Sequence, residues 1–110
     1  MLPATESCEH RSAMRLCTIN GCSVEPQNID RLREIFAAYG KDVKENEPGC
    51  LLLRMHQDDA DPGHFVVYAE FEDQAAYDAH LASEHVARLR GTLHEIIGDS
   101  HHKTILRPIE

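Results

Sequence analysis

The sequence predicts an α+β domain of the ferredoxin-like type, in which the element order β-α-β-β-α-β produces a four-stranded antiparallel sheet with helices on one face. Three observations support this fold class. Four short apolar runs have the character of strands, two longer stretches repeat apolar residues with helical spacing, and a polar segment containing Pro62-Gly63 separates two neighbouring runs as a hairpin loop would. A chain of 110 residues allows one domain.

The first half of the chain predicts a strand followed by a helix. Residues 13–24 (AMRLCTINGCSV) form the strand, in which Gly21 indicates a bulge or a bend near the end. Pro26 suits the first turn of the helix. Gly40 weakens this helix and is a candidate end of its regular part, and Pro48-Gly49 stops it. Its buried stripe should consist of Ile29, Leu32, Ile35, Phe36, Tyr39 and Val43.

The second half predicts a hairpin, a pair of helices and a last strand. Strands at residues 50–56 and 64–71 should pair in antiparallel fashion across the loop 57–63. Asp73 is a good N-cap for a short helix, and Ser83 could cap the next one, which Gly98 is placed to end. The last strand is expected at 104–109. The buried stripe of the last helix should be Val86, Leu89, Leu93, Ile96 and Ile97.

Charge and composition exclude several kinds of partner. The formal net charge of −8 disfavours binding to nucleic acid or to an anionic membrane. No apolar run approaches the roughly 20 residues that cross a bilayer, and residues 1–12 lack the apolar centre of a signal peptide. We therefore expect a cytoplasmic protein with a disordered tail at 1–12 and a domain at 13–110. The four cysteines match no zinc-binding spacing and should be reduced.

Both faces of the predicted sheet are apolar. The second strand places Leu51 and Leu53 on one side and Leu52 on the other, and the third strand carries apolar residues on both sides as well. The helices can cover only one of these faces. Because an exposed apolar face of this size is unfavourable for a monomer, we expect a homodimer in which two sheets pack against each other.

One stretch, His64 to Val86 (HFVVYAEFEDQAAYDAHLASEHV), gathers aromatic and histidine side chains where a strand is followed by a helix. At this point the chain resembles the antibiotic biosynthesis monooxygenase family. The resemblance rests on Glu47-Pro48-Gly49-Cys50-Leu51, on Phe65 to Phe71, on Asp73 to His80 and on Ser83-Glu84-His85-Val86, and it covers roughly residues 14–108. It implies a dimeric α+β barrel. The family includes monooxygenases that act on quinols and polycyclic phenols without metal or flavin, haem-degrading enzymes and an isomerase of a phosphorylated sugar.

The match to the haem-degrading members is incomplete. Asn20 falls at the position of their asparagine, but Phe71 stands where they have a tryptophan, and Arg90 stands where they have the iron-binding histidine. The polyketide-type members have a tyrosine that Tyr77 matches and an arginine that Arg90 or Arg88 could supply. The resemblance therefore favours the metal-free oxygenases over the haem degraders.

Cofactor-free oxygenation needs a base for the substrate proton, a group that stabilises the resulting anion, and a dry cavity. We expect His85 to be the base and Tyr77, Asn20 and Arg90 to complete the catalytic set. Each has a structural alternative, such as a core position for Tyr77 and an ion pair for Arg90. The residues expected to bind an aromatic substrate are Phe71, His80, Phe65 and Phe36.

No cofactor and no metal are expected. Local metal-binding spacings such as H-E-x-x-H are absent, and the adjacent His101 and His102 would point to opposite faces of a strand. A metal site would require residues distant in the sequence to converge. The main hypothesis is a cofactor-independent monooxygenase that oxidises a quinol-like or polycyclic phenolic molecule with O2. The alternatives are a small-molecule isomerase of the same fold and a non-catalytic protein that binds a hydrophobic ligand, haem included.

Overall fold

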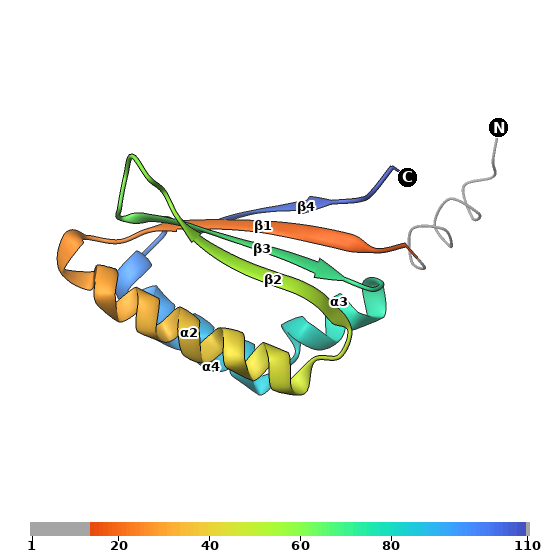
Figure 1. Ribbon diagram of the computed structural model, residues 1–110. Helices are drawn as coiled ribbons and strands as arrows, with labels where there is room; N and C mark the ends of the chain where they lie inside the picture. The colour runs from red at the N-terminus through yellow and green to blue at the C-terminus, as the bar shows by residue number, and fades with distance from the viewer. Residues whose placement is uncertain (1–13, 110) are drawn as a thin grey trace.

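The computed structural model describes residues 14–109, so the expected tail at 1–12 lies outside the described residues. Four strands form one antiparallel sheet in the order β2-β3-β1-β4, and the helices cover one face of it (Figure 1). This confirms the predicted ferredoxin-like α+β fold. The strands are β1 (Leu16–Ser23), β2 (Cys50–Gln57), β3 (His64–Phe71) and β4 (His102–Leu106). The helices are the short 3-10 helix η1 (Pro26–Asn28), α2 (Ile29–Asn46), α3 (Gln74–Leu81) and α4 (Glu84–Ile97).

The helix ends that border the site follow the predicted capping pattern. The side chain of Asp73 accepts a hydrogen bond from the backbone N–H of Ala76 and begins α3. The side chain of Ser83 accepts one from the N–H of Val86 and begins α4, which ends at Gly98 with a positive φ of 55°. These local signals fix where α3 and α4 begin.

Two glycine predictions were wrong, and tertiary contacts explain both. Gly40 does not end α2, which continues to Asn46, because the buried stripe extends past it to Val43. Gly21 causes no bulge, since β1 pairs regularly through it with both β3 and β4. A Cβ atom at position 21 would overlap the ring of His102, so the glycine makes room for this ring. β4 starts at His102 instead of residue 104, because its pairing with β1 extends to Gly21 opposite His102.

The core lies between the helices and the inner face of the sheet. Phe71, Leu16, Leu32 and Val43 are its most completely buried large side chains. Inner-facing residues of β3 alternate with half-buried residues on the outer face, as the period of a strand requires. The buried residues along β3 are Phe65, Val67, Ala69 and Phe71.

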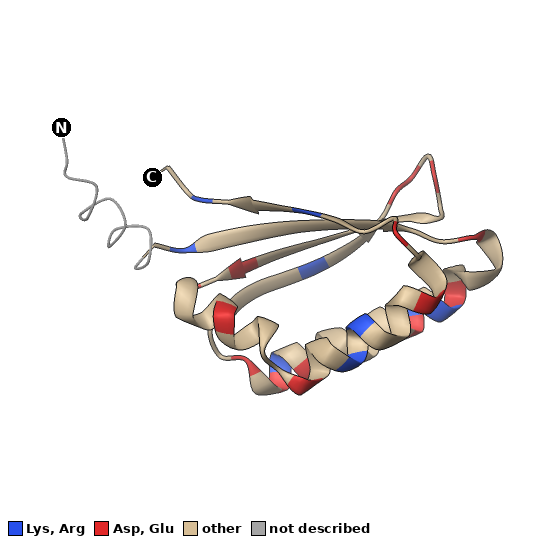
Figure 2. Cartoon of the chain, turned by 180° about the vertical axis from the view of Figure 1, so that it is seen from behind, with Lys and Arg blue, Asp and Glu red and all other residues tan. Residues whose placement is uncertain are grey.

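Within residues 14–109, no helix covers the outer face of the sheet. Val66 and Tyr68 are half-buried there, and Leu106, which pairs with Cys17, remains 40% exposed. Acidic and basic residues gather along the helices, whereas the strands carry few charges (Figure 2). The described part of the chain contains no helix that is both long and apolar enough to cross a membrane.

Gly49 lies where the chain passes closely under α3, and its replacement should destabilise the fold. A Cβ at position 49 would lie 2.6 Å from the Cβ of Ala76, so Gly49→Ala should cost about 1–3 kcal/mol through overpacking. The control is Gly91→Ala, because a Cβ at position 91 in α4 meets nothing within 4 Å. That helical substitution should stabilise by about 0.5–1 kcal/mol. Urea unfolding measures the free energy of unfolding of both variants. Equal changes in the two variants would contradict the close approach of α3 to Gly49.

Candidate active site

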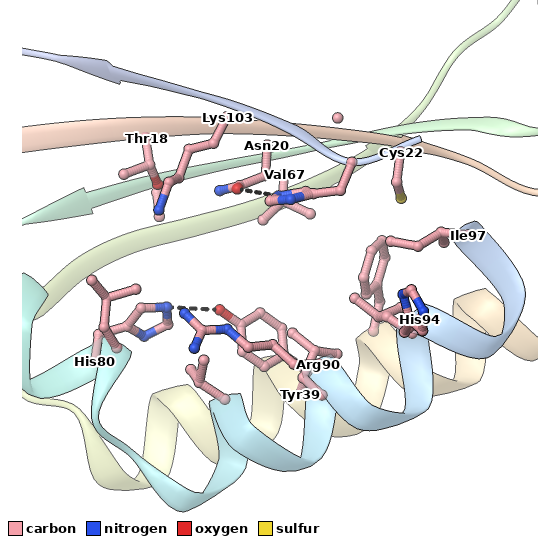
Figure 3. A pocket seen from close by; sticks show the side chains of 18 of the residues that line it. Thr18, Asn20, Cys22, Tyr39, Val67, His80, Arg90, His94, Ile97 and Lys103 are labelled. Atoms are coloured by element: carbon pink, nitrogen blue, oxygen red, sulfur yellow. Dashed lines mark hydrogen bonds between the residues drawn. The ribbon is translucent and has the colours of Figure 1, made fainter. Parts of the chain in front are cut away.

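A cavity of about 470 Å³ lies between the inner face of the sheet and the helices (Figure 3). The strands contribute small and polar side chains to it, including Thr18 and Asn20, and the helices contribute mostly apolar ones. A volume of this size suits a small organic molecule. Its principal side chains are Thr18, Asn20, Cys22, Phe36, Tyr39, Leu53, Val67, Tyr77, His80, Leu89, Arg90, Leu93, His94, His101 and Lys103.

At one wall of this cavity, a buried tyrosine and a buried histidine are hydrogen-bonded. The hydroxyl of Tyr39, from α2, lies 3.2 Å from Nε2 of His80, in the last turn of α3 (Figure 3). Both residues are buried, and both line the cavity. A molecule in the cavity can therefore approach the Nε2 side of His80.

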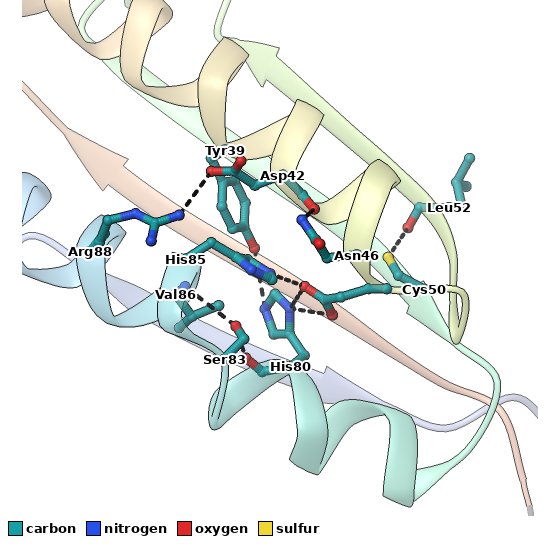
Figure 4. Close-up of polar contacts among 11 residues, drawn as sticks. Tyr39, Asp42, Asn46, Cys50, Leu52, His80, Ser83, His85, Val86 and Arg88 are labelled. Atoms are coloured by element: carbon teal, nitrogen blue, oxygen red, sulfur yellow. Dashed lines mark hydrogen bonds and ion pairs between the residues drawn. The ribbon is translucent and has the colours of Figure 1, made fainter.

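Glu47 lies behind His80 and joins it to His85. Nδ1 of His80 lies 2.9 Å from each carboxyl oxygen of Glu47, and Nε2 of His85 contacts the same carboxyl group (Figure 4). The side chains of Glu47, His80 and His85 are only 10%, 11% and 8% exposed. We call these three residues the Glu-His-His cluster. Glu47 follows the end of α2, His80 lies in the last turn of α3 and His85 lies in the first turn of α4, so the cluster joins three helix ends.

The short link between α3 and α4 sets the positions of the two histidines. The hydroxyl of Ser83 donates to the backbone oxygen of His80 at 2.7 Å and accepts from the N–H of Val86. One side chain thus closes α3 and opens α4, which brings both imidazole rings to the same carboxyl group.

The Glu47 contact selects a tautomer of His80. A neutral imidazole carries one N–H, and only a donor at Nδ1 can hydrogen-bond the carboxyl oxygens of Glu47. The proton therefore lies on Nδ1, and Nε2 accepts from the Tyr39 hydroxyl. Burial lowers the pKa of His80 below its ordinary value, and this outweighs the attraction of Glu47 for the charged form. Burial, followed by the Glu47 charge, raises the pKa of Tyr39 far above its ordinary value, so its phenol stays protonated.

Cationic and amide groups from β1, β4 and α4 line the cavity. Nζ of Lys103 donates to the hydroxyl of Tyr77 at 2.7 Å. Oδ1 of Asn20 lies 2.8 Å from Nε2 of His101. Arg90 reaches the cavity from α4 (Figure 3). These groups can stabilise negative charge on a bound molecule.

The structure gathers some of the predicted site residues around the cavity and places others elsewhere. Asn20, Phe36, Tyr77, His80 and Arg90 line it. The remaining three predicted residues, His85, Phe65 and Phe71, are not among its lining residues.

The rings of Phe65 and Phe71 belong to the core. The Phe65 ring packs edge-on against Phe36 at 6.1 Å between centroids. The Phe71 ring packs against Tyr77 at 5.3 Å and against His80 at 4.9 Å. Phe71 thus supports two cavity residues from behind. His85 lines a second hollow of about 570 Å³, as does Glu47, so the Glu-His-His cluster separates this hollow from the main cavity.

Three residues of the site were missed as functional residues by the sequence analysis. Glu47 belongs to the Glu-Pro-Gly-Cys motif. This motif indicated the family but gave no indication of what Glu47 does. Tyr39 was assigned to the buried stripe of α2, where it does lie. Lys103 lies in the last strand and reaches Tyr77 only through the pairing of β4 with β1.

Comparison with known proteins identifies the family and the fold. The antibiotic biosynthesis monooxygenase family model matches residues 16–91. A solved antibiotic biosynthesis monooxygenase is 28% identical to the chain, with a TM-score of 0.78 over 86% of this chain and 99% of that one. A candidate antibiotic biosynthesis monooxygenase from Caulobacter crescentus CB15 is 16% identical, with a TM-score of 0.85 over 96% of this chain and 99% of that one. A conserved protein from Methanosarcina mazei Go1 is 18% identical, with a TM-score of 0.79 over 90% and 97%. No curated protein matches the sequence significantly.

The low pKa of His80 should be visible in solution. We expect the ring to titrate below the ordinary value of 6.5, so that it is neutral at pH 7. The folded chain then binds fewer protons than the unfolded chain, and the free energy of unfolding should fall as the pH drops from about 7 to about 5. His80→Gln lacks this contribution and should lose less stability over the same range. NMR titration of labelled histidine rings locates the midpoint, and a midpoint above 6.5 would mean that Glu47 keeps the ring charged.

Proposed function

Because the chain belongs to the antibiotic biosynthesis monooxygenase family, we propose that it oxidises a quinol-like or polycyclic phenolic small molecule with O2, without an organic or haem cofactor. The observation that carries this proposal is the ordered pair Glu47–His80 at the wall of a mostly apolar cavity. It supplies a neutral imidazole at the place where an aromatic ring would bind, and the acceptor nitrogen of this imidazole is now hydrogen-bonded to the Tyr39 hydroxyl.

His80 is the proposed base. Glu47 fixes its tautomer, and Nε2 accepts the substrate phenol proton once the substrate takes over the position now held by the Tyr39 hydroxyl. The sequence favoured His85, but His85 lies on the far side of Glu47 from the cavity. We propose that His85 instead positions Glu47.

Deprotonation makes the substrate electron-rich enough to reduce oxygen. One atom of O2 enters the product, the other leaves as water, and the substrate itself is the reductant. Arg90, Asn20 and the Lys103–Tyr77 pair are placed to stabilise the phenolate. The apolar side chains of α4 and Phe36 exclude water from the ring.

A second candidate function rests on the cations at the cavity. Arg90 and Lys103 also suit an anionic substrate, which favours the isomerase alternative, in which His80 would move a proton between two carbon or oxygen atoms. Oxygen consumption separates the two reactions, because an isomerase uses none.

Oxygen uptake by the chelator-treated protein tests the proposal with a panel of quinols and hydroxylated polycyclic phenols, each with an autoxidation blank. We expect uptake above the blank, and His80→Gln should reduce it by about 10²–10⁴-fold because the base is lost. Glu34→Gln is the control, since Glu34 is exposed on α2 and is not among the residues that line the cavity. Turnover without oxygen uptake would favour the isomerase, and uptake that survives His80→Gln would remove His80 as the base.

We further propose that the outer face of the sheet joins two copies of the chain. The half-buried Val66 and Tyr68 and the exposed Leu106 support this proposal, as does the scarcity of charge on the strands (Figure 2). The family resemblance, which implies dimers, also supports it.

Sedimentation equilibrium tests the dimer. Val66→Asp puts a charge on the outer face and should convert the dimer to a monomer, because an unpaired carboxylate would be buried between the sheets. Arg33→Asp introduces the same side chain on the exposed side of α2 and should leave the dimer intact. A wild-type protein that is monomeric at all concentrations would reject this arrangement.

A further inference from the structure

We propose that the Glu-His-His cluster is a binding site for a divalent transition-metal ion of the Zn²⁺ type. Two neutral imidazoles and one carboxylate are a donor set that Zn²⁺ and its neighbours accept, with further positions left for water. The three residues are distant in the sequence or fall outside known motif spacings, which is why no metal was expected from the sequence. The fold supplies the convergence that such a site requires.

The donor atoms already lie at nearly the spacing of a coordination sphere. One donor atom from each of Glu47, His80 and His85 lies within 4.8 Å of the other two. Ligands held about 2.0–2.2 Å from a zinc ion are separated from one another by about 3–3.5 Å. Nδ1 of His80 lies 2.9 Å from both carboxyl oxygens, so small side-chain rotations suffice to admit an ion. Within residues 14–109 it is the one group of three such donors that converges in this way.

The surroundings also resemble those of a metal centre. All three side chains are nearly buried, which limits competition from water. The second ring nitrogen of His80 is held by the Tyr39 hydroxyl at 3.2 Å, and such a contact orients a metal-binding imidazole. Ser83 fixes the helix ends that carry both histidines. The ligands are therefore held in place before any ion binds.

An ion can reach the cluster without passing through the ligand cavity. Glu47 and His85 line the second hollow, and the exposed carboxylates of Glu72 and Glu84 line it as well. The basic residue at this hollow, Arg88, is paired with Asp42 at 3.5 Å (Figure 4). The entrance therefore favours cations.

Metal binding and base catalysis would exclude each other. An ion on Nδ1 of His80 moves the ring proton to Nε2, the atom that faces the cavity, and Nε2 can then no longer accept a proton. This consequence, in which the metal switches off the base, rests on the proposed function. The proposed metal site does not depend on the proposed function, and it can be tested without a substrate.

Calorimetric titration of the chelator-stripped full-length protein with Zn²⁺ tests the site, with Co²⁺ as a spectroscopic probe. We expect one ion per chain and the visible bands of nitrogen- and oxygen-bound Co²⁺. Glu47→Gln and His85→Ala should each weaken binding by more than the roughly 10–100-fold that loss of a hydrogen-bond partner of a ligand costs, because each removes a ligand itself. His94→Ala is the matched control, because His94 lines the main cavity but lies outside the cluster, and it should bind as the wild type does.

Ring NMR signals of the wild-type protein make the test independent of how well the variants fold. Zn²⁺ should shift the resonances of His80 and His85 together, at one equivalent, and leave His94 unchanged. Two results would overturn the proposal. One is the absence of stoichiometric binding, which would leave the cluster as a purely hydrogen-bonded group. The other is binding that survives Glu47→Gln and does not shift these two rings, which would place the ion on other histidines or on the thiols.

Discussion

The shared carboxyl group of Glu47 is the contact on which the rest of the site depends. It lies just beyond the end of α2 and receives one imidazole from the end of α3 and one from the start of α4. A carboxyl group with only 10% of its side chain exposed is costly unless its oxygens are satisfied, and the two histidines satisfy them. The three helix ends are therefore held at one point, and the cavity between helices and sheet keeps its shape on that side.

This arrangement divides the sheet into two faces with different roles. The inner face provides both the core and the floor of the cavity, and Phe71 connects them because its buried ring supports Tyr77 and His80. The outer face carries apolar side chains such as Val66 and Leu106, and no helix within residues 14–109 covers it. A small domain that encloses a ligand cavity has less room for a core of its own. In the proposed dimer, the sheet of the second copy would bury the apolar side chains of the outer face.

The features that depend on contacts between residues close in the sequence were predicted correctly. Those that depend on contacts between distant elements were missed. The caps at Asp73 and Ser83 were predictable because each side chain bonds a backbone group three residues away. The roles of Gly21 and Gly40 were not, since both depend on side chains from other elements, His102 in one case and the continued buried stripe of α2 in the other. Of the cavity residues from β1, α3 and α4, the sequence identified Asn20, Tyr77, His80 and Arg90 as site residues and left the other lining residues of these elements without a role.

The choice between His80 and His85 shows where sequence reasoning reaches its limit. The two histidines are five residues apart, lie at neighbouring helix ends and contact the same carboxyl group. They differ in that His80 lines the main cavity and His85 lines the second hollow, which the local sequence does not determine. Because the fold places Tyr39 against Nε2 of His80, this ring is the one with a reactive nitrogen toward the cavity. Whether that nitrogen carries a lone pair or a proton depends in turn on what occupies Nδ1, so the chemistry on the cavity side is set by the group bound on the other side of the ring.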